Sequence, residues 1–176
     1  NQGREGGWMY LLASAYAVAG IQPLVSRIVV MMVSFLTLAA VYRLGRETIS
    51  RRAAVWAAAG LAVLYWHVQV GHLALRANLF PLVGTMAFAA LFLAYKHNKP
   101  GGWALAGALF GLLAYTYPAA RLWIAYGLLL QARWLLREKD KRRGVLLSWL
   151  LAGLIALPLA LYILAHPADT SHRIVG

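Results

Sequence analysis

The sequence predicts an all-α protein, a polytopic bundle of about six membrane-spanning helices with one further helix lying on the membrane surface. Of the 176 residues, 62% are apolar and only 12% are charged, whereas soluble domains carry about 45–50% and roughly 25%. The mean hydropathy is +0.65. A water-surrounded core of this size cannot hide so many apolar side chains, so lipid must solvate much of the chain.

Six apolar segments give the predicted spans. A helix that crosses the hydrocarbon layer needs about 20 mainly apolar residues. With soft boundaries, the segments are residues 23–44, 53–69, 79–95, 103–117, 122–136 and 145–166. The fifth segment contains Arg133 near its end, where a long side chain can reach the interface. We expect a single membrane domain over residues 1–176, with 1–22 ending an outer loop and 167–176 beginning another outer segment.

The basic residues alternate between the gaps. Twelve of the seventeen lie in three alternate gaps: Arg43, Arg46, Arg51 and Arg52, then Lys96 and Lys99, then Arg133, Arg137, Lys139, Lys141, Arg142 and Arg143. The positive-inside rule places these gaps in the cytoplasm. Both chain ends are then expected on the non-cytoplasmic side of an integral protein of the bacterial plasma membrane. The charge of +12 reflects topology, and no nucleic-acid partner is expected.

Residues 8–20 form an apolar segment that is too short to cross. Counting it as a crossing would break the charge alternation, so we expect an interfacial helix in which Trp8, Tyr10 and Tyr16 lie in the outer interface. A re-entrant dip is the alternative. Four other tryptophans near span ends are expected to form an interfacial aromatic belt: Trp66, Trp103, Trp123 and Trp134.

Several functional classes receive no support. There is no cysteine, which excludes disulfides, thiol catalysis and cysteine-bound metals. No phosphate-binding glycine loop, dinucleotide fingerprint or zinc-protease motif occurs. The chain begins at Asn1 without a signal peptide, so we expect a piece of a longer protein.

Polar residues on the predicted outer face are the candidates for function. Arg4 and Glu5 precede the interfacial helix beside glycines. Glu5 is either a carboxylate stabilised by the helix dipole or a general base or metal ligand. Glu47, Glu138 and Asp140, among cations of the opposite face, are expected to be solvated loop charges.

A second outer element covers residues 65–78. His67 and His72 are five residues apart, which does not place two imidazoles on one helical face and argues against a zinc pair. Arg76 is suited to bidentate capture of a phosphate, with a lipid-headgroup contact as the alternative.

A third outer element is a turn broken by Pro118. It brings together Tyr115, Tyr117 and Arg121, which either stack a sugar and hold a phosphate or form a belt cluster with a snorkelling arginine. In the last outer segment, Asp169 and His172 are three residues apart and able to meet.

The chain resembles the GT-C membrane glycosyltransferases of the dolichyl-phosphate-mannose–protein mannosyltransferase superfamily. The similar bacterial branch includes the aminoarabinose lipid A transferases and Rgt-type domains. The resemblance rests on Arg4-Glu5 with Tyr10, Arg27, Leu44-Gly45-Arg46, Trp66-His67 with Arg76, and residues 115–121.

The resemblance implies transfer of a hexosyl or pentosyl group from a polyprenyl-phosphate sugar to a lipid, glycan or protein acceptor of the cell envelope, on the non-cytoplasmic face. It implies that Glu5 is the catalytic base or a ligand of a divalent metal cation, the one cofactor expected. Arg4, Arg76 and Arg121 would then bind phosphate, with Tyr115 and Tyr117 in the donor cavity. Gly6-Gly7-Trp8 replaces the Lys-Pro-Pro that many members have after the acidic residue.

The resemblance also implies that the first acidic residue of the family and further helices lie outside this segment, which is expected to be inactive alone. The alternative function is a polytopic transporter or lipid flippase. Such proteins usually carry polar residues near the middle of their helices, whereas the spans here are apolar through their middles.

Overall fold

The computed structural model describes residues 6–72 and 76–165, and within these ranges the chain is helical with no strand. The all-α prediction is therefore confirmed. The elements are α1 (Gly7–Ala19), α2 (Pro23–Thr48), α3 (Arg51–Val63), α4 (Tyr65–His72), the 3₁₀ turn η1 (Arg76–Asn78), α5 (Leu79–His97), α6 (Pro100–Leu113), α7 (Ala120–Arg137), the 3₁₀ turn η2 (Lys139–Lys141) and α8 (Arg142–Ala165).

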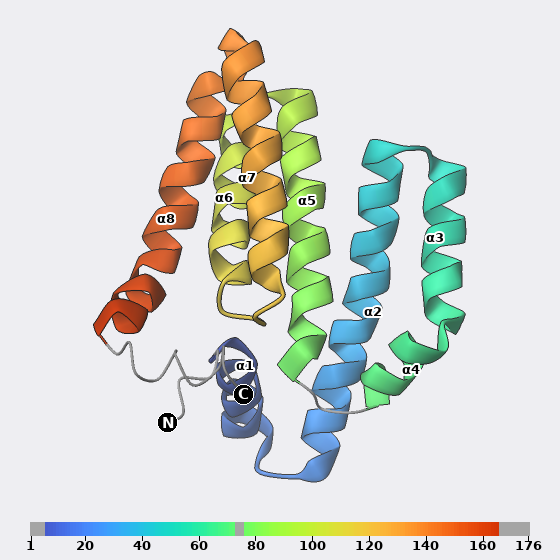
Figure 1. Ribbon diagram of the computed structural model, residues 1–176. Helices are drawn as coiled ribbons and strands as arrows, with labels where there is room; N and C mark the ends of the chain where they lie inside the picture. The colour runs from blue at the N-terminus through green and yellow to red at the C-terminus, as the bar shows by residue number, and fades with distance from the viewer. Residues whose placement is uncertain (1–5, 73–75, 166–176) are drawn as a thin grey trace.

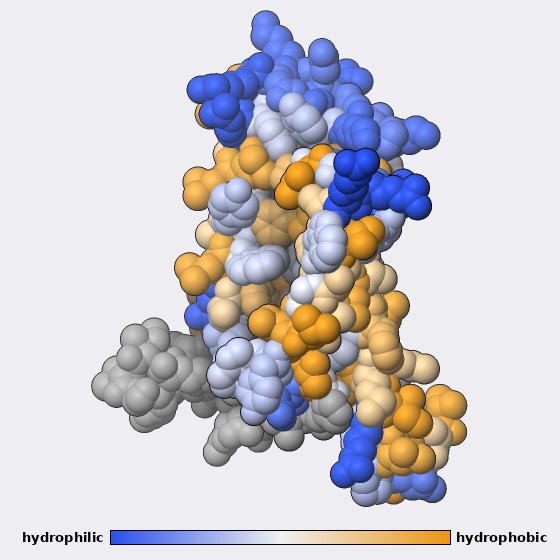
Figure 2. All heavy atoms as spheres, turned by 90° about the vertical axis from the view of Figure 1, so that its right-hand side faces the viewer, coloured by the Kyte–Doolittle hydropathy of each residue, from blue (hydrophilic) through white to orange (hydrophobic). Residues whose placement is uncertain are grey.

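Along the chain, α2, α3, α5, α6, α7 and α8 alternate in direction, as Figure 1 shows. The connections from α2 to α3, from α5 to α6 and from α7 to α8 all lie at one end of the molecule, which we call the basic end. Helix α1, η1 and the turn between α6 and α7 lie at the opposite, outer end. Figure 2 shows hydrophilic side chains gathered at the basic end beside a predominantly apolar band. This arrangement matches the alternation of charge along the sequence.

Within the described residues, three helices are long and apolar enough to cross a membrane: Pro23–Thr48, Leu79–His97 and Lys139–Ala165. Helices α1 and α6 are apolar but shorter. Together with the family described below, these helices make the chain an integral membrane protein. The number of six crossings stays a prediction.

The predicted span 53–69 is wrong as one continuous helix. Helix α3 ends at Val63, and Leu64 has an extended conformation with φ −67° and ψ 120°. A 13-residue helix is about 20 Å long. Helix α4 then packs on α2, where a Cβ added to Gly71 would lie 2.9 Å from Ser34 Oγ. The β-branched and aromatic residues around the break have modest helix propensity, so packing decides the path.

Helices α6 and α8 make the closest contact in the bundle. A Cβ on Gly107 would overlap the backbone of Ser148, and a Cβ on Gly111 would lie 2.8 Å from Ile155 Cβ. Small residues let membrane helices approach in this way. The buried cluster around this contact also includes Leu91, Leu113 and other side chains of α5 and α6.

Trp103 and Trp134 are core residues, which corrects their assignment to the interfacial belt. They are 1% and 7% exposed. Trp103 Nε1 donates a hydrogen bond to Asn98 Oδ1 at 3.1 Å, and the indole occupies the space beside Gly144, where no Cβ could fit. Trp134 stacks on Tyr95 with ring centroids 4.3 Å apart. Trp66, in contrast, is 72% exposed.

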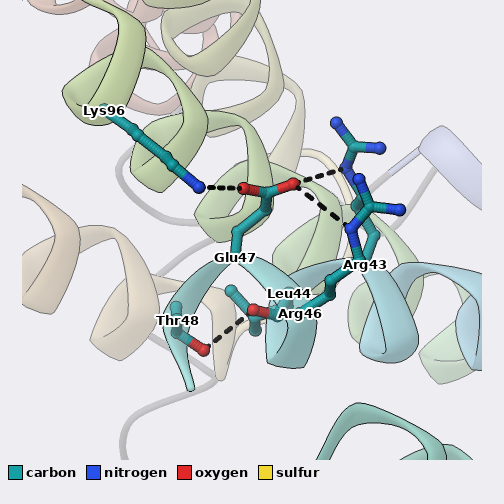
Figure 3. Close-up of polar contacts among 6 residues, drawn as sticks. All are labelled: Arg43, Leu44, Arg46, Glu47, Thr48 and Lys96. Carbon is teal, nitrogen blue, oxygen red and sulfur yellow. Dashed lines mark hydrogen bonds and ion pairs between the residues drawn. The ribbon is translucent and has the colours of Figure 1, made fainter. Parts of the chain in front are cut away.

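Glu47 is not a solvated loop charge as predicted, because it belongs to α2 and its side chain is only 6% exposed. Figure 3 shows Lys96 reaching it from α5, on the side away from Arg43 and Arg46. These ion pairs join α2 to α5 at the basic end.

A second contact at the basic end joins α5 to the connection between α7 and α8. The Tyr95 hydroxyl donates to Glu138 Oε1 at 2.9 Å, and Lys141 Nζ lies 2.7 Å from Glu138 Oε2. The hydrogen bond from Lys141, followed by that from Tyr95, holds the pKa of the Glu138 carboxyl below its ordinary value.

The first prediction concerns the contact between α6 and α8. Gly107→Ala should lower the free energy of unfolding by about 1–3 kcal/mol, because the added methyl overlaps rigid backbone. Gly153→Ala is the matched control: it lies in α8 with open space around its Cβ position, so the better helix propensity of alanine should leave stability unchanged or raise it by up to about 1 kcal/mol. Denaturant unfolding in detergent measures both, and equal stability of the two variants would contradict the packing account.

The second prediction concerns pH. Because the folded state lowers the pKa of Glu138, this carboxylate contributes stability above its unfolded pKa of about 4.3, and the contribution is lost as the pH falls through the folded pKa. The melting temperature of the wild type should therefore exceed that of Glu138→Gln near neutral pH. The difference should shrink on acidification toward about pH 3. Asp140→Asn, in the same connection, is the control, and a gap that widens with acid would refute the prediction.

Candidate functional site

Three segments that are distant in the sequence meet around Gly7 at the outer end. The Gly7 backbone N–H donates to the Tyr115 carbonyl at 3.2 Å, which joins the start of α1 to the turn between α6 and α7. A Cβ added to Gly7 would lie 2.8 Å from that carbonyl oxygen and 3.5 Å from Leu79 Cδ2, at the start of α5. Two of the outer elements expected from the sequence, the start of α1 and the turn at residues 115–121, thus meet beside the start of α5, at a place that we call the outer junction.

Trp8 anchors α1 beside the junction. Its side chain is 2% exposed and packs in a cluster with Val30 and Val33 of α2 and Leu82 of α5. The expectation that Trp8 lies in the membrane interface is therefore wrong, since the indole faces the protein. The rest of α1 leaves large apolar side chains on its surface, and Tyr10 is 75% exposed, as expected of a surface helix.

Tyr115 tethers the turn to α8. Its hydroxyl donates to the Ile155 carbonyl at 2.8 Å. Pro158 lies inside α8, where it lacks the N–H that a helix normally directs at the carbonyl four residues before, and its ring disturbs that turn. The carbonyl left without that bond is that of Leu154, and the Tyr115 hydroxyl binds the next carbonyl of the same disturbed turn, that of Ile155. The Tyr115 hydroxyl therefore has a structural partner.

The turn between α6 and α7 is held by hydrogen bonds to backbone carbonyls a few residues away. The buried Thr116 hydroxyl donates to the Leu113 carbonyl at 2.7 Å, so α6 ends at Leu113, four residues before the end of the predicted span. The half-buried Tyr117 accepts the Ala120 N–H through its carbonyl at 2.9 Å, which begins α7.

Arg121 lies in the first turn of α7 and is exposed. A cation at a helix N-terminus opposes the helix dipole by roughly 0.3–1 kcal/mol. Helix stability therefore does not explain an arginine at this position, and both earlier interpretations, a phosphate ligand and a snorkelling arginine in the lipid interface, stay open.

Other predicted residues are placed only in part. Arg4 and Glu5 lie outside the described residues, as do Asp169 and His172. Arg76 begins η1, directly before α5, but its side chain is not described. Across residues 6–72 and 76–165, no group of three or more histidine, aspartate or glutamate side chains is arranged to hold a metal ion.

The residue that the sequence reasoning missed is Gly7. It makes its contact through the backbone, and no side-chain pattern marks such a group. In the sequence, Gly6-Gly7 is only a glycine pair between Glu5 and the surface helix, yet the contact requires glycine at position 7 because a Cβ would press on the Tyr115 carbonyl.

The chain matches the profile of a known protein family. The profile of the family described as dolichyl-phosphate-mannose-protein mannosyltransferase matches residues 7–166, a range that contains the outer junction and every described helix. No curated protein and no solved structure matches the chain.

The third prediction tests the outer junction. Gly7→Ala should push the start of α1 away from Tyr115 and increase amide hydrogen exchange in residues 114–119 severalfold or more, as expected for overpacking that costs about 1–3 kcal/mol. Gly6→Ala is the matched control, because the atoms nearest to its Cβ position belong to the side chain of the exposed Tyr10, which can move, and not to backbone. Unchanged exchange in Gly7→Ala would show that the turn does not depend on this contact.

Proposed function

The chain belongs to the dolichyl-phosphate-mannose-protein mannosyltransferase family, and we propose that it transfers a sugar from a polyprenyl-phosphate donor to a lipid, glycan or protein acceptor on the non-cytoplasmic face. The family indicates a membrane glycosyltransferase of the GT-C type; the donor, the acceptor and the active face belong to the proposal. The observation that carries it is the outer junction, where the start of α1 meets the turn before Arg121.

Glu5 is the proposed catalytic carboxylate. It is two residues before Gly7 in the sequence, and Gly7 is bonded to the turn that leads into α7. In the proposed reaction, the acceptor hydroxyl oxygen bonds to the anomeric carbon of the sugar as the bond from that carbon to the phosphate oxygen breaks. The carboxylate takes the hydroxyl proton, and the polyprenyl phosphate leaves with the bonding electrons, so the anomeric configuration inverts.

The developing charge on the leaving phosphate needs cations. Arg121 is the described candidate, since it is exposed at the outer end of α7, and a guanidinium can bind phosphate in a bidentate manner. Arg4 and Arg76 are proposed for the same role. We also propose a divalent cation with Glu5 as a ligand. Among the described residues, no group of three or more histidine, aspartate or glutamate side chains is placed to hold it.

The tyrosines would act mainly as walls of the donor cavity. Because the Tyr115 hydroxyl already bonds to Ile155, we propose that its ring, rather than its hydroxyl, faces the sugar. Tyr117, one turn before Arg121, is half-buried and is proposed to contribute a second aromatic face.

The fourth prediction tests these roles. In membranes that contain the protein, Glu5→Gln should lower the rate of sugar transfer from a polyprenyl-phosphate sugar by about 10²–10⁴-fold, the usual contribution of a general base. Asp140→Asn removes a carboxylate at the basic end and should leave the rate unchanged. Full activity in a correctly folded Glu5→Gln protein would exclude Glu5 from the reaction.

Arg121 has its own test within the same assay. Arg121→Gln should raise the KM for the lipid-linked donor, and Arg121→Lys should recover part of the loss, because lysine keeps the charge and loses the bidentate geometry. Equal behaviour of the two variants and the wild type would assign Arg121 to the lipid interface.

A further inference from the structure

The ion cluster at the basic end carries more positive charge than its own carboxylate needs. Glu47 pairs with Lys96 at 3.4 Å, with Arg43 at 3.4 Å and with Arg46 at 3.8 Å. The carboxylate is nearly buried, whereas the three cationic side chains are about half exposed or more. Three cations around one carboxylate leave two positive charges that are not neutralised within the cluster (Figure 3).

An apolar groove lies directly beside this cluster. It has a volume of about 420 Å³ and is formed between α2, α5 and α7, a size that falls in the range of small-molecule sites. Phe88 lines the groove and contacts two aromatic rings of α7, Trp123 and Tyr126. The lining residues are Leu44, Thr48, Phe88, Phe92, Leu122, Trp123 and Tyr126.

The groove and the cations are continuous. On α5, Phe88, Phe92 and Lys96 follow one another at intervals of four residues, which places them on one face of the helix. On α2, Leu44 and Thr48 line the groove on either side of Glu47 in the sequence, and the Thr48 hydroxyl donates to the Leu44 carbonyl at 2.8 Å. At the basic end of the molecule, the apolar groove therefore leads to charged groups that carry a net positive charge.

We propose that this site binds an anionic glycerophospholipid from the leaflet at the basic end. The headgroup phosphate binds the exposed guanidinium groups of Arg43 and Arg46, Lys96 adds positive charge from the other side of Glu47, and one acyl chain occupies the aromatic groove. An amphiphile with one anionic head matches both features, because its head meets the excess of two positive charges and its chain fills the apolar groove. A free phosphate would leave the groove empty, and an apolar helix would leave the charge unmatched. This site is separate from the outer junction, and the proposal does not depend on the sugar-transfer chemistry.

The test measures lipid binding to the purified protein in neutral detergent by native mass spectrometry. The probes are phosphatidylglycerol and phosphatidylcholine with the same acyl chains, and inorganic phosphate as a competitor. We expect phosphatidylglycerol to bind at least tenfold more tightly than phosphatidylcholine and inorganic phosphate not to displace it. Raising the salt concentration should weaken binding.

Two variants separate the headgroup from the chain. Arg43→Gln with Arg46→Gln keeps the pair between Lys96 and Glu47 that joins α2 to α5, and should weaken phosphatidylglycerol binding by about 30-fold, because each basic residue near an anionic surface contributes roughly fivefold. Thr48→Trp adds bulk to the groove without changing charge and should weaken binding through the acyl chain. The matched control is Arg51→Gln with Arg52→Gln, two exposed arginines at the start of α3 that do not line the groove.

Several results would overturn the proposal. Equal binding of the two lipids, or an equal loss in the Arg51/Arg52 control, would show general attraction to charge. Displacement by inorganic phosphate would assign the cluster to a small anion. Unchanged lipid binding in Thr48→Trp, or a second copy of the chain cross-linked across the groove, would assign the groove to another occupant.

Discussion

The close contact between α6 and α8 at Gly107 and Gly111 is the constraint on which the outer junction depends. Lipid tails are as apolar as leucine, so apolar side chains gain little by leaving lipid for a neighbouring helix, and close packing has to supply the attraction. The two glycines allow this approach. Because α6 lies so near α8, the Tyr115 hydroxyl reaches the Ile155 carbonyl, and the same residue receives the Gly7 N–H.

The two ends of the bundle are held together by different means. At the basic end, charged and aromatic side chains such as Glu47, Lys96 and Trp134 join neighbouring helices. Among the described residues of the outer end, hydrogen bonds to the Tyr115 and Ile155 carbonyls join α1, the turn and α8. Trp8 is an apolar anchor there, and the Phe80 ring packs against Trp123 to join α5 to α7.

The sequence predicted the helices and their alternation because hydropathy and charge report how deep a residue lies in the membrane. They do not report which way a helix is rotated about its axis when all its faces are apolar. Trp103 and Trp134 lie near helix ends, as expected of belt residues, and yet face the core. Glu47 likewise lies among cations at the expected level, but its side chain turns inward toward α5. The break at Leu64 was missed for a related reason: α4 leaves the axis of α3 to pack on α2, and that tertiary contact is invisible in a local apolar run.

The candidate site was predictable in its parts and not in its connections. Polar residues on the expected outer face marked the start of α1 and the turn between α6 and α7, because such residues are costly near lipid. What joins these two segments is a main-chain hydrogen bond from Gly7, and main-chain groups are the same in every sequence. In the sequence, such a contact is visible only as a glycine, the residue that has no side chain. A glycine pair directly before an apolar surface helix is therefore informative about close backbone approach as well as about flexibility, and here the approach brings the sequence that follows Glu5 against the turn that leads to Arg121.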